Sequence, residues 1–84
     1  MMDNLGRLKD AFVEGLSIPK DTNFSSLEYR SIEEWDSVAH MLLIGEIENV
    51  FDVMLETQDV IDMSSFVKAQ EILCKYGVTF ATDE

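Results

Sequence analysis

Apolar residues recur at steps of three or four along most of this chain, which is the spacing that gathers them on one face of an α-helix. From Asp3 to Leu16 they alternate with charged residues, and Pro19 ends the segment because proline cannot continue the hydrogen bonding of a helix. A second helical pattern extends from Val38 to Val53 behind Asp36-Ser37, two residue types that cap helices. The apolar stripes of these segments consist of Leu5, Leu8, Phe12, Leu16, Met41, Ile44, Ile47 and Phe51.

Two further helical patterns follow along the chain. Glu56 to Met63 is short and acidic, and Val60 and Ile61 are its expected inward residues. The last pattern runs from Ser65, a capping residue, to Tyr76, and Gly77 is expected to end it. The sequence has neither strand-like alternation nor an Asn-Gly hairpin signal. It therefore predicts an all-α fold, a small four-helix bundle made of three main helices plus one short third helix.

The connection between the first two helices is long. Residues from Pro19 to Trp35 mix turn formers with scattered apolar side chains, so we expect a loop with at most one short helical turn, held down by those side chains. At the other end, residues 78–84 have no helical period and finish in charge, which predicts a flexible tail. Residues 1–84 are expected to form a single domain.

With only 84 residues, the domain has a thin core. Seven apolar residues are expected to carry most of it: Leu8, Phe12, Leu16, Ile47, Phe51, Phe66 and Ile72. The single cysteine, Cys74, cannot form an internal disulfide and is expected to be a small buried side chain. The start of the chain does not resemble a signal peptide, and no stretch approaches the roughly 20 apolar residues of a membrane span, so we expect a cytoplasmic protein.

The charge distribution favours protein partners. The chain carries a net charge of −11, which repels phosphate backbones and anionic lipids, so nucleic-acid binding is not expected. No basic residue occurs between Arg30 and Lys68, and the acid is therefore concentrated around the second and third helices. This interval is either a solvated face of a soluble monomer or a negative docking face for basic partners.

The second helix contains more apolar residues than one buried stripe can accommodate. Met41-Leu42-Leu43-Ile44 places four in succession, so at least one faces solvent, and Leu42 is the best candidate. Gly45 follows, although a glycine inside a helix costs about 1 kcal/mol relative to alanine. A contact surface would explain both features, and a local packing constraint would also suffice.

Few residues offer chemistry of their own. The single His40 and single Cys74 are far apart and the carboxylates lack calcium-loop spacing, so no metal site is expected. Asp36, Ser37 and His40 are the residue types of a nucleophilic triad, but one helical turn without an oxyanion hole lacks the triad geometry, and no enzymatic activity is expected. The simplest interpretation is that Asp36 or Ser37 caps a helix and His40 lies on the surface.

Several features together resemble the acyl carrier protein family, over roughly Leu5 to Tyr76. They are the four-helix pattern, the long first loop, Asp36-Ser37-Val38 where that family has Asp-Ser-Leu, the acidic residues after it, and the late phenylalanine in Glu48-Asn49-Val50-Phe51-Asp52. The resemblance implies that Ser37 receives 4′-phosphopantetheine, a covalent cofactor joined by a phosphopantetheinyl transferase from coenzyme A. It also implies that Asp36 helps to bind magnesium and coenzyme A in the transferase complex, and that the thiol of the arm carries acyl intermediates as thioesters.

The same resemblance suggests the partners. They would be acyl-loading, condensing or transferring enzymes with basic patches. These enzymes would dock on four residues of the second helix: Val38, Leu42, Glu46 and Glu48. A phosphodiester on Ser37 would lie at a helix N-terminus, where unpaired N–H groups and the helix dipole favour negative charge. Trp35 would either pack the end of the loop onto the bundle or lie beside the arm.

Some positions depart from the family pattern. Glu33-Glu34 stand where Leu-Gly is common, and Ala39 and Leu42 stand where fatty-acid carriers are often acidic. These departures favour a dedicated carrier for a specialised pathway, such as polyketide, peptide-like or modified-sugar assembly, at least as much as one for fatty-acid-like synthesis. The alternative hypothesis is an unmodified acidic helical interaction module that binds a basic partner.

Overall fold

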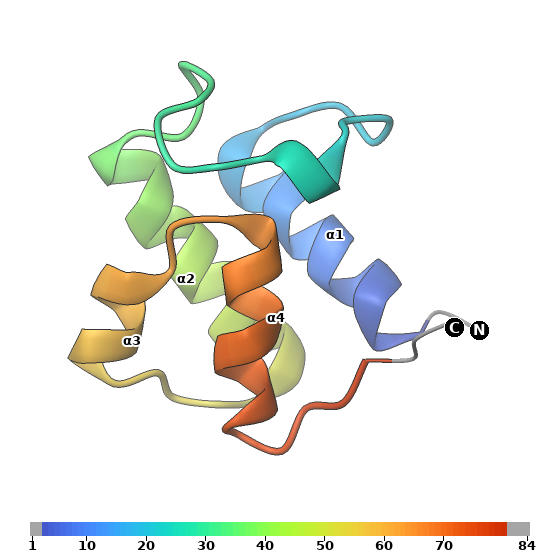
Figure 1. Ribbon diagram of the computed structural model, residues 1–84, viewed down its shortest axis with the longest axis vertical. Helices are drawn as coiled ribbons and strands as arrows, with labels where there is room; N and C mark the ends of the chain where they lie inside the picture. Colours follow the sequence, from blue (N-terminus) through green and yellow to red (C-terminus); the bar gives the residue numbers. More distant parts are fainter. Residues whose placement is uncertain (1–2, 81–84) are drawn as a thin grey trace.

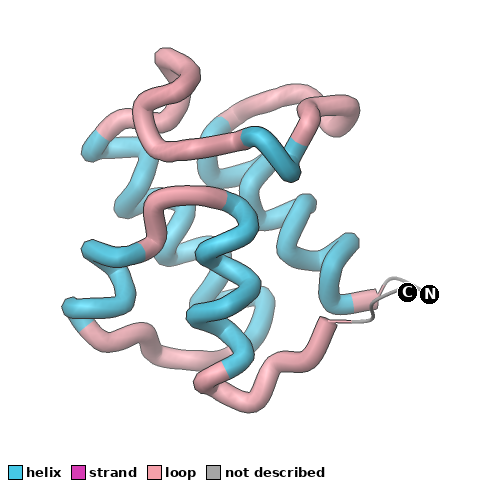
Figure 2. The backbone as a smooth tube through the Cα atoms, viewed as in Figure 1, coloured by secondary structure: helices cyan, strands magenta, loops and turns pink. Residues whose placement is uncertain are grey.

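Four helices make up the computed structural model, which describes residues 3–80 (Figure 1). They are α1 (Asn4–Leu16), α2 (Ser37–Phe51), α3 (Thr57–Asp62) and α4 (Phe66–Cys74). The connection between α1 and α2 holds one 3₁₀ turn, η1 (Phe24–Ser26), and residues 3–80 form no strand (Figure 2). The predicted all-α fold, with its short third helix and long first loop, is confirmed.

The long first connection lies across one end of the bundle (Figure 1). Helices α1 and α2 make the most extensive contact between elements, and η1 packs on α4. A single bridge joins Glu28 to Ser65, so the loop is also tied to the start of α4. Among residues 3–80, no helix is both long enough and apolar enough to cross a membrane.

Local sequence signals set the helix ends. The side chains of Asp3, Asp36 and Ser65 each accept a hydrogen bond from the backbone N–H three residues later, which caps α1, α2 and α4. After α4, Gly77 has a φ of 89° and Val78 N–H donates to the carbonyl of Leu73. This is a Schellman arrangement, in which the left-handed residue is most easily a glycine, so Gly77 closes the turn that follows α4. The helix that was predicted to reach Tyr76 ends at Cys74.

The core is centred on aromatic rings from three parts of the chain. The ring of Phe12 packs edge-on against Trp35 at 5.4 Å and against Phe66 at 5.0 Å between centroids. Phe24 of η1 packs on Phe66 from the other side. All the predicted core residues are buried except Phe51, which is half-buried beneath Arg7. The loop side chains thus complete the core, because the helices alone do not enclose it.

The register predicted for α2 is wrong at Met41. This side chain is 61% exposed, whereas Leu43 is fully buried and packs towards α1. Residues two apart point to nearly opposite sides of a helix, so the apolar run allowed either to face inward. The close approach of α1 decides between them, because a Cβ at Gly15 would lie only 2.6 Å from the Leu43 Cα.

Two other predicted inward residues are exposed. Ile61 of α3 is 68% exposed, while its neighbour Val60 is half-buried. Cys74, expected to be buried, is also exposed, because Ile72 and Leu73 occupy the inner face at this end of α4. In short helical segments the periodicity alone did not fix which neighbour turns inward.

The end of the chain is packed as far as the structure describes it. Val78 is buried, the Thr79 carbonyl accepts a 2.8 Å hydrogen bond from Asn4, and Phe80 lies edge-on to Phe51. Residues 78–80 therefore lie against the bundle, where the sequence analysis expected a flexible tail, because they cover the ends of α1 and α2. Residues 81–84 of that predicted tail lie outside the described residues.

A buried carboxylate joins α3 to the turn after α4. Asp59 is 5% exposed, and it accepts hydrogen bonds from the Lys75 ammonium and the Tyr76 hydroxyl. The Tyr76 hydroxyl in turn accepts a hydrogen bond from Glu56 N–H, at 2.9 Å. The bond from Lys75, followed by that from Tyr76, lowers the pKa of Asp59 below its usual value. The ionised form of Asp59 thus stabilises the folded state.

We expect this link to make the fold sensitive to acid. Because the folded-state pKa of Asp59 is lowered, its contribution to stability is present above about pH 4 and is lost as the pH falls through the lowered value. Asp59→Asn should lower the thermal unfolding temperature at pH 7 and reduce its decline between pH 5 and pH 3. The control is Asp62→Asn, an exposed carboxylate of the same helix. Equal acid sensitivity of wild type and Asp59→Asn would contradict the assignment.

Candidate functional site

Ser37 occupies an exposed position at the start of α2. Its Oγ atom lies 3.0 Å from the hydroxyl oxygen of Tyr29, within hydrogen-bonding distance. Asp36 precedes it as the helix cap and accepts a 2.9 Å hydrogen bond from Ala39 N–H through Oδ1. The first turn of α2 therefore presents a hydroxyl group to solvent beside unpaired backbone N–H groups.

Tyr29 forms one wall of the site. Its backbone N–H donates to the Ser64 carbonyl at 2.8 Å, and its ring lies edge-on to both Trp35 and His40. The hydrogen bond with Ser37, and after it the nearby Arg30 guanidinium, lower the pKa of Tyr29. Tyr29 thus contacts the Ser37 hydroxyl through its own hydroxyl and has a cation beside its ring.

His40 and Trp35 form the floor of the site. Trp35 is fully buried, its ring stacks on His40, and its Nε1–H donates to His40 Nδ1 at 2.9 Å. Because Trp35 can only donate, His40 Nδ1 must be unprotonated, which puts the imidazole proton on Nε2. Nε2–H then donates to the Val60 carbonyl at 2.8 Å. His40 is half-buried rather than on the surface and holds α3 against α2.

Asp36, Ser37 and His40 are the residue types of a catalytic triad, but in the structure each of them has a different hydrogen-bond partner. Ser37 has Tyr29 as its side-chain partner, and both ring nitrogens of His40 are engaged elsewhere. Asp36 caps the helix. Trp35 packs the end of the loop onto the bundle, which was one of its two predicted placements. In this arrangement Ser37 is not hydrogen-bonded to His40, so no proton relay joins them.

A groove with a volume of about 380 Å³ opens beside Ser37, between α2, α3 and the first connection. Its lining is mainly apolar and aromatic, with two serine hydroxyl groups at the edge. The lining residues are Tyr29, Ser37, His40, Met41, Val60, Ile61, Met63 and Ser64. A group attached to Ser37 would start at the mouth of this groove.

An exposed apolar patch surrounds the groove. Val38, Met41 and Leu42 of α2, together with Ile61 of α3, are between 61% and 71% exposed. Val38 lies three and four residues before Met41 and Leu42, so the three share one side of α2. Gly45 continues that side and has no atom within 4 Å of a Cβ placed on it. We call these four side chains the apolar patch; two of them, Val38 and Leu42, were predicted to dock partners.

The two predicted acidic docking residues lie in different surroundings. Glu46 is half-buried and follows Leu42 by one turn, on the side of α2 that carries the apolar patch. Glu48 points elsewhere, because its Oε2 atom accepts a 2.9 Å hydrogen bond from Leu55 N–H. Its carboxylate thus fixes the connection between α2 and α3. The structure brings Glu46 to the patch but not Glu48.

Sequence reasoning missed several members of this site. Tyr29 comes from the loop, eight residues before Ser37, and no spacing rule connects the two. Met41 and Ile61 were assigned to the core, although both line the groove. The one available signal was the surplus of apolar residues on α2, which pointed to an exposed surface without identifying its members.

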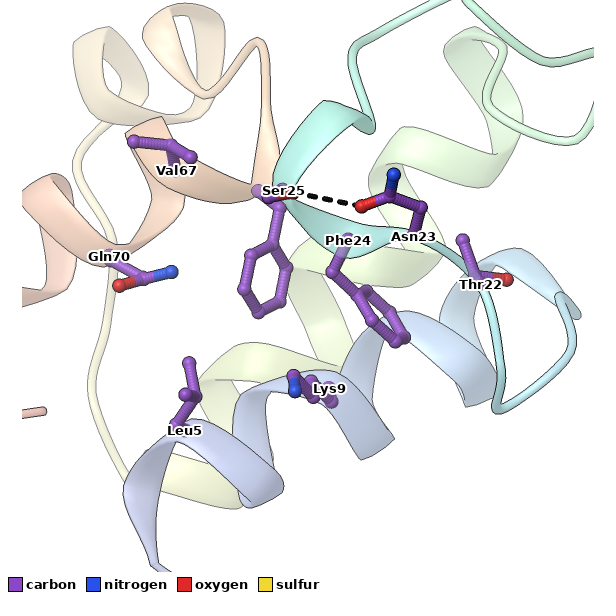
Figure 3. Close-up of a pocket in the computed structure, with 9 residues that line it drawn as sticks. Leu5, Lys9, Thr22, Asn23, Phe24, Ser25, Val67 and Gln70 are labelled. Carbon is purple, nitrogen blue, oxygen red and sulfur yellow. Dashed lines mark hydrogen bonds between the residues drawn. The ribbon is translucent and has the colours of Figure 1, made fainter. Parts of the chain in front are cut away.

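A second hollow lies on another side of the molecule, between α1, η1 and α4 (Figure 3). Its volume is about 350 Å³, and the Lys9 ammonium lies 5.7 Å from the centre of the Phe24 ring within it. It shares no lining residue with the groove at Ser37. Within residues 3–80, no group of three or more His, Cys, Asp or Glu side chains is placed to hold a metal ion.

Comparisons of the chain with protein-family models, with curated proteins and with solved structures found no match. The geometry at Ser37 is therefore the basis on which a function has to be argued. It combines an exposed hydroxyl at a helix N-terminus, a mainly apolar groove and an apolar patch around it.

Proposed function

We propose that this protein is a carrier that holds acyl groups on a 4′-phosphopantetheine arm attached to Ser37. One observation carries the proposal: the exposed Ser37 hydroxyl opens onto the mouth of a mainly apolar groove of about 380 Å³. The resemblance of the chain to acyl carrier proteins supports the same conclusion. The arm supplies a thiol that holds the cargo as a thioester, so the carrier needs no catalytic side chain of its own.

Attachment of the arm is a phosphoryl-transfer reaction at Ser37. The Ser37 Oγ atom bonds to the phosphorus of the phosphopantetheine half of coenzyme A, and the bond to the departing adenosine bisphosphate breaks. The hydroxyl proton passes to a base of the transferase. In this chain Asp36 orders the first turn of α2 around Ser37, and its second carboxylate oxygen remains available to the magnesium ion and transferase.

The residues present fit the arm. Its phosphodiester would lie at the N-terminus of α2, where the N–H groups and the helix dipole favour an anion. The apolar walls contributed by Met41, Val60 and Ile61 suit an acyl chain, because burial stabilises it by about 0.8 kcal/mol per methylene group. The carrier would thus shelter a cargo against the bundle between reactions.

The apolar patch is the proposed docking surface for partner enzymes. Patches of exposed apolar side chains commonly mark interaction sites. Here the net charge of −11 would steer enzymes with basic patches, while Val38, Leu42 and their neighbours supply the contact. An apolar recognition helix favours a dedicated carrier of a specialised pathway. We place this carrier in the cytoplasm, as a monomer.

The direct test is modification in solution. The chain is incubated with coenzyme A, magnesium and a broad-specificity phosphopantetheinyl transferase, and its intact mass is measured. We expect a gain of one phosphopantetheinyl group in the wild type and none in Ser37→Ala. Ser64→Ala is the matched control, because Ser64 is exposed and lines the same groove. A gain that persists in Ser37→Ala, or no gain with several transferases, would sink the proposal.

The apolar patch also favours a second candidate function, an unmodified interaction module. The two functions differ in their dependence on Ser37. A module should bind its basic partner equally well in wild type and Ser37→Ala, but should lose binding in Leu42→Asp. A carrier should lose cargo transfer in both variants, the first through the missing arm and the second through impaired docking.

A further inference from the structure

We propose that Tyr29 and Arg30 form an anion-binding pair that holds the phosphate ester carried by Ser37. This inference rests on the proposed function, in which Ser37 carries a phosphodiester. The Tyr29 hydroxyl oxygen is already 3.0 Å from Ser37 Oγ, the atom that becomes the ester oxygen. The guanidinium carbon of Arg30 lies 5.5 Å from the centre of the Tyr29 ring. A phosphate on Ser37 therefore begins within reach of the Tyr29 O–H, and the Arg30 guanidinium lies beside the ring of that same tyrosine.

The turn that carries this pair is rigidly built. Ser31 N–H donates to the Glu28 carbonyl at 3.0 Å, which closes a four-residue turn around Tyr29 and Arg30. The hydroxyl of Ser31 donates to the same carbonyl at 2.6 Å. Arg30 N–H donates to the Trp35 carbonyl, and Tyr29 N–H donates to the Ser64 carbonyl. The backbone of the pair is thus fixed at Tyr29 to the segment before α4 and at Arg30 to the buried Trp35.

Arg30 occupies a position at which arginine is unfavourable for the backbone. Its φ of 68° lies in the left-handed region, and the third residue of such a turn is most easily glycine or asparagine. Residues held in sparsely populated conformations are strained, and they concentrate at functional sites. A glycine at position 30 would avoid this strain. The arginine found there therefore points to a role for its side chain.

The charges around Ser37 explain what a cation does there. Asp36 is the nearest carboxylate in sequence, and its charge acts on Tyr29 in the direction opposite to Arg30. The chain carries 17 acidic and 6 basic residues, and no basic residue lies between Arg30 and Lys68. An added phosphate beside Asp36 would be repelled unless a positive group offset it. Arg30 is the basic residue placed to do so, and a guanidinium binds phosphate oxygens through several N–H donors.

Tyr29 would change its role on modification. In the unmodified chain, the hydrogen bond between the Ser37 and Tyr29 hydroxyl groups lowers the pKa of Tyr29. Esterification removes the Ser37 hydroxyl proton and adds negative charge, so the phenol can only donate to the ester, and its pKa rises. The size of this rise, compared with that caused by Ser37→Ala, therefore reports on contact with the phosphate.

The decisive experiment uses the full 84-residue chain made by chemical synthesis with phosphoserine at position 37, which requires no transferase. The probe is the phosphate itself, titrated by ³¹P NMR in wild type, Arg30→Gln, Arg30→Lys and Tyr29→Phe. We expect the second dissociation constant of the phosphate to fall about threefold in Arg30→Gln, since an adjacent cation favours the dianion, and to be largely retained in Arg30→Lys. Lys20→Gln, an equal charge change elsewhere in the same loop, is the control.

Folding of each variant is checked first by thermal unfolding of the unmodified chain. The proposed pair is supported if the second dissociation constant of the phosphate falls at least twice as much in Arg30→Gln as in Lys20→Gln. A smaller difference between the two variants, or none, overturns the proposal. A parallel series carries the phosphopantetheinyl group in place of phosphoserine and compares unfolding temperatures before and after attachment. On attachment, the unfolding temperature of Arg30→Gln should fall by about 4 °C more than that of Lys20→Gln. An equal change in the two variants overturns the proposal for this ester.

The two series separate the possible failures. If no transferase modifies Ser37 but the phosphoserine chain responds to Arg30, the carrier function fails and the pair binds a simple phosphate ester. If the arm is attached but Arg30 and Lys20 variants behave alike, the carrier function stands and the pair does not. The ultraviolet titration of Tyr29 adds an independent readout, because its pKa should rise more on modification of the wild type than on Ser37→Ala, which removes the hydroxyl alone. A rise no larger than that of Ser37→Ala would show that the phosphate points away from the phenol.

Discussion

Trp35→Ala is expected to lower the free energy of unfolding by about 3–5 kcal/mol, as large aromatic truncations in cores do. Trp35 is fully buried and its ring contacts Phe12, Tyr29 and His40. Native proteins have total stabilities of about 5–15 kcal/mol, so this loss would remove most of the stability of a domain at the lower end of that range. Urea denaturation followed by far-ultraviolet circular dichroism measures the change.

Trp35→Phe separates packing from hydrogen bonding at the same position. Phenylalanine retains most of the buried ring but cannot donate to His40 Nδ1, which leaves this part-buried acceptor without its partner. We expect a loss of about 1–3 kcal/mol, smaller than that of the alanine variant. A loss of less than 1 kcal/mol in Trp35→Ala would show that the loop contributes little to the core, contrary to the structure.

Gly15→Ala is the second substitution with a large expected effect. Its new Cβ would lie 2.6 Å from the Leu43 Cα and 3.1 Å from the Leu43 backbone nitrogen, both of which belong to α2. A backbone helix cannot move aside as a flexible side chain can, so α1 and α2 would have to separate along their main contact. Overpacking of this kind costs about 1–3 kcal/mol, even though alanine is the better helix former.

Gly45→Ala is the matched substitution, and it should act in the opposite direction. Gly45 also lies inside a helix, but a Cβ there has no neighbour within 4 Å. Helix propensity then dominates, and we expect a gain of up to about 1 kcal/mol. Denaturation of Gly15→Ala and Gly45→Ala under the same conditions tests both predictions. An increase in the free energy of unfolding of Gly15→Ala would refute the close contact between the helices.

Gly45 also bears on function, because it lies on the same side of α2 as the apolar patch. A glycine that the fold does not require leaves room for a partner to approach the helix closely. If the patch docks enzymes, Gly45→Trp should weaken docking without lowering stability. The proposed carrier function thus explains a residue that stability alone disfavours.

The helices themselves could be predicted from the sequence. Asp3, Asp36 and Ser65 cap α1, α2 and α4, and Gly77 closes the turn after α4, because these signals act through hydrogen bonds to residues a few positions away. The long loop could also be predicted, since Pro19 and the turn formers after it oppose a helix. Periodicity identified part of the core for the same local reason: six of the seven predicted core residues are buried.

The candidate site could be predicted only in part. Ser37 and its helix N-terminus followed from the Asp-Ser pair, and Leu42 from the surplus of apolar residues, but Tyr29, Arg30, Met41 and Ile61 did not. Their membership depends on how the loop and α3 are placed against α2. Glu48, which was predicted to dock a partner, accepts a hydrogen bond from the backbone N–H of Leu55 beyond the end of the helix.

The sequence by itself determined where the helices begin and, to within two residues, where they end, and that Ser37 would open the second of them, because these are short-range properties of the backbone. Only the tertiary structure decided which side of α2 is buried, since the close approach at Gly15 selects Leu43 over Met41. It also placed Tyr29 beside Ser37 and fixed the proton of His40 on Nε2. These features arise from contacts between side chains brought together by packing, whose free energy no local pattern encodes.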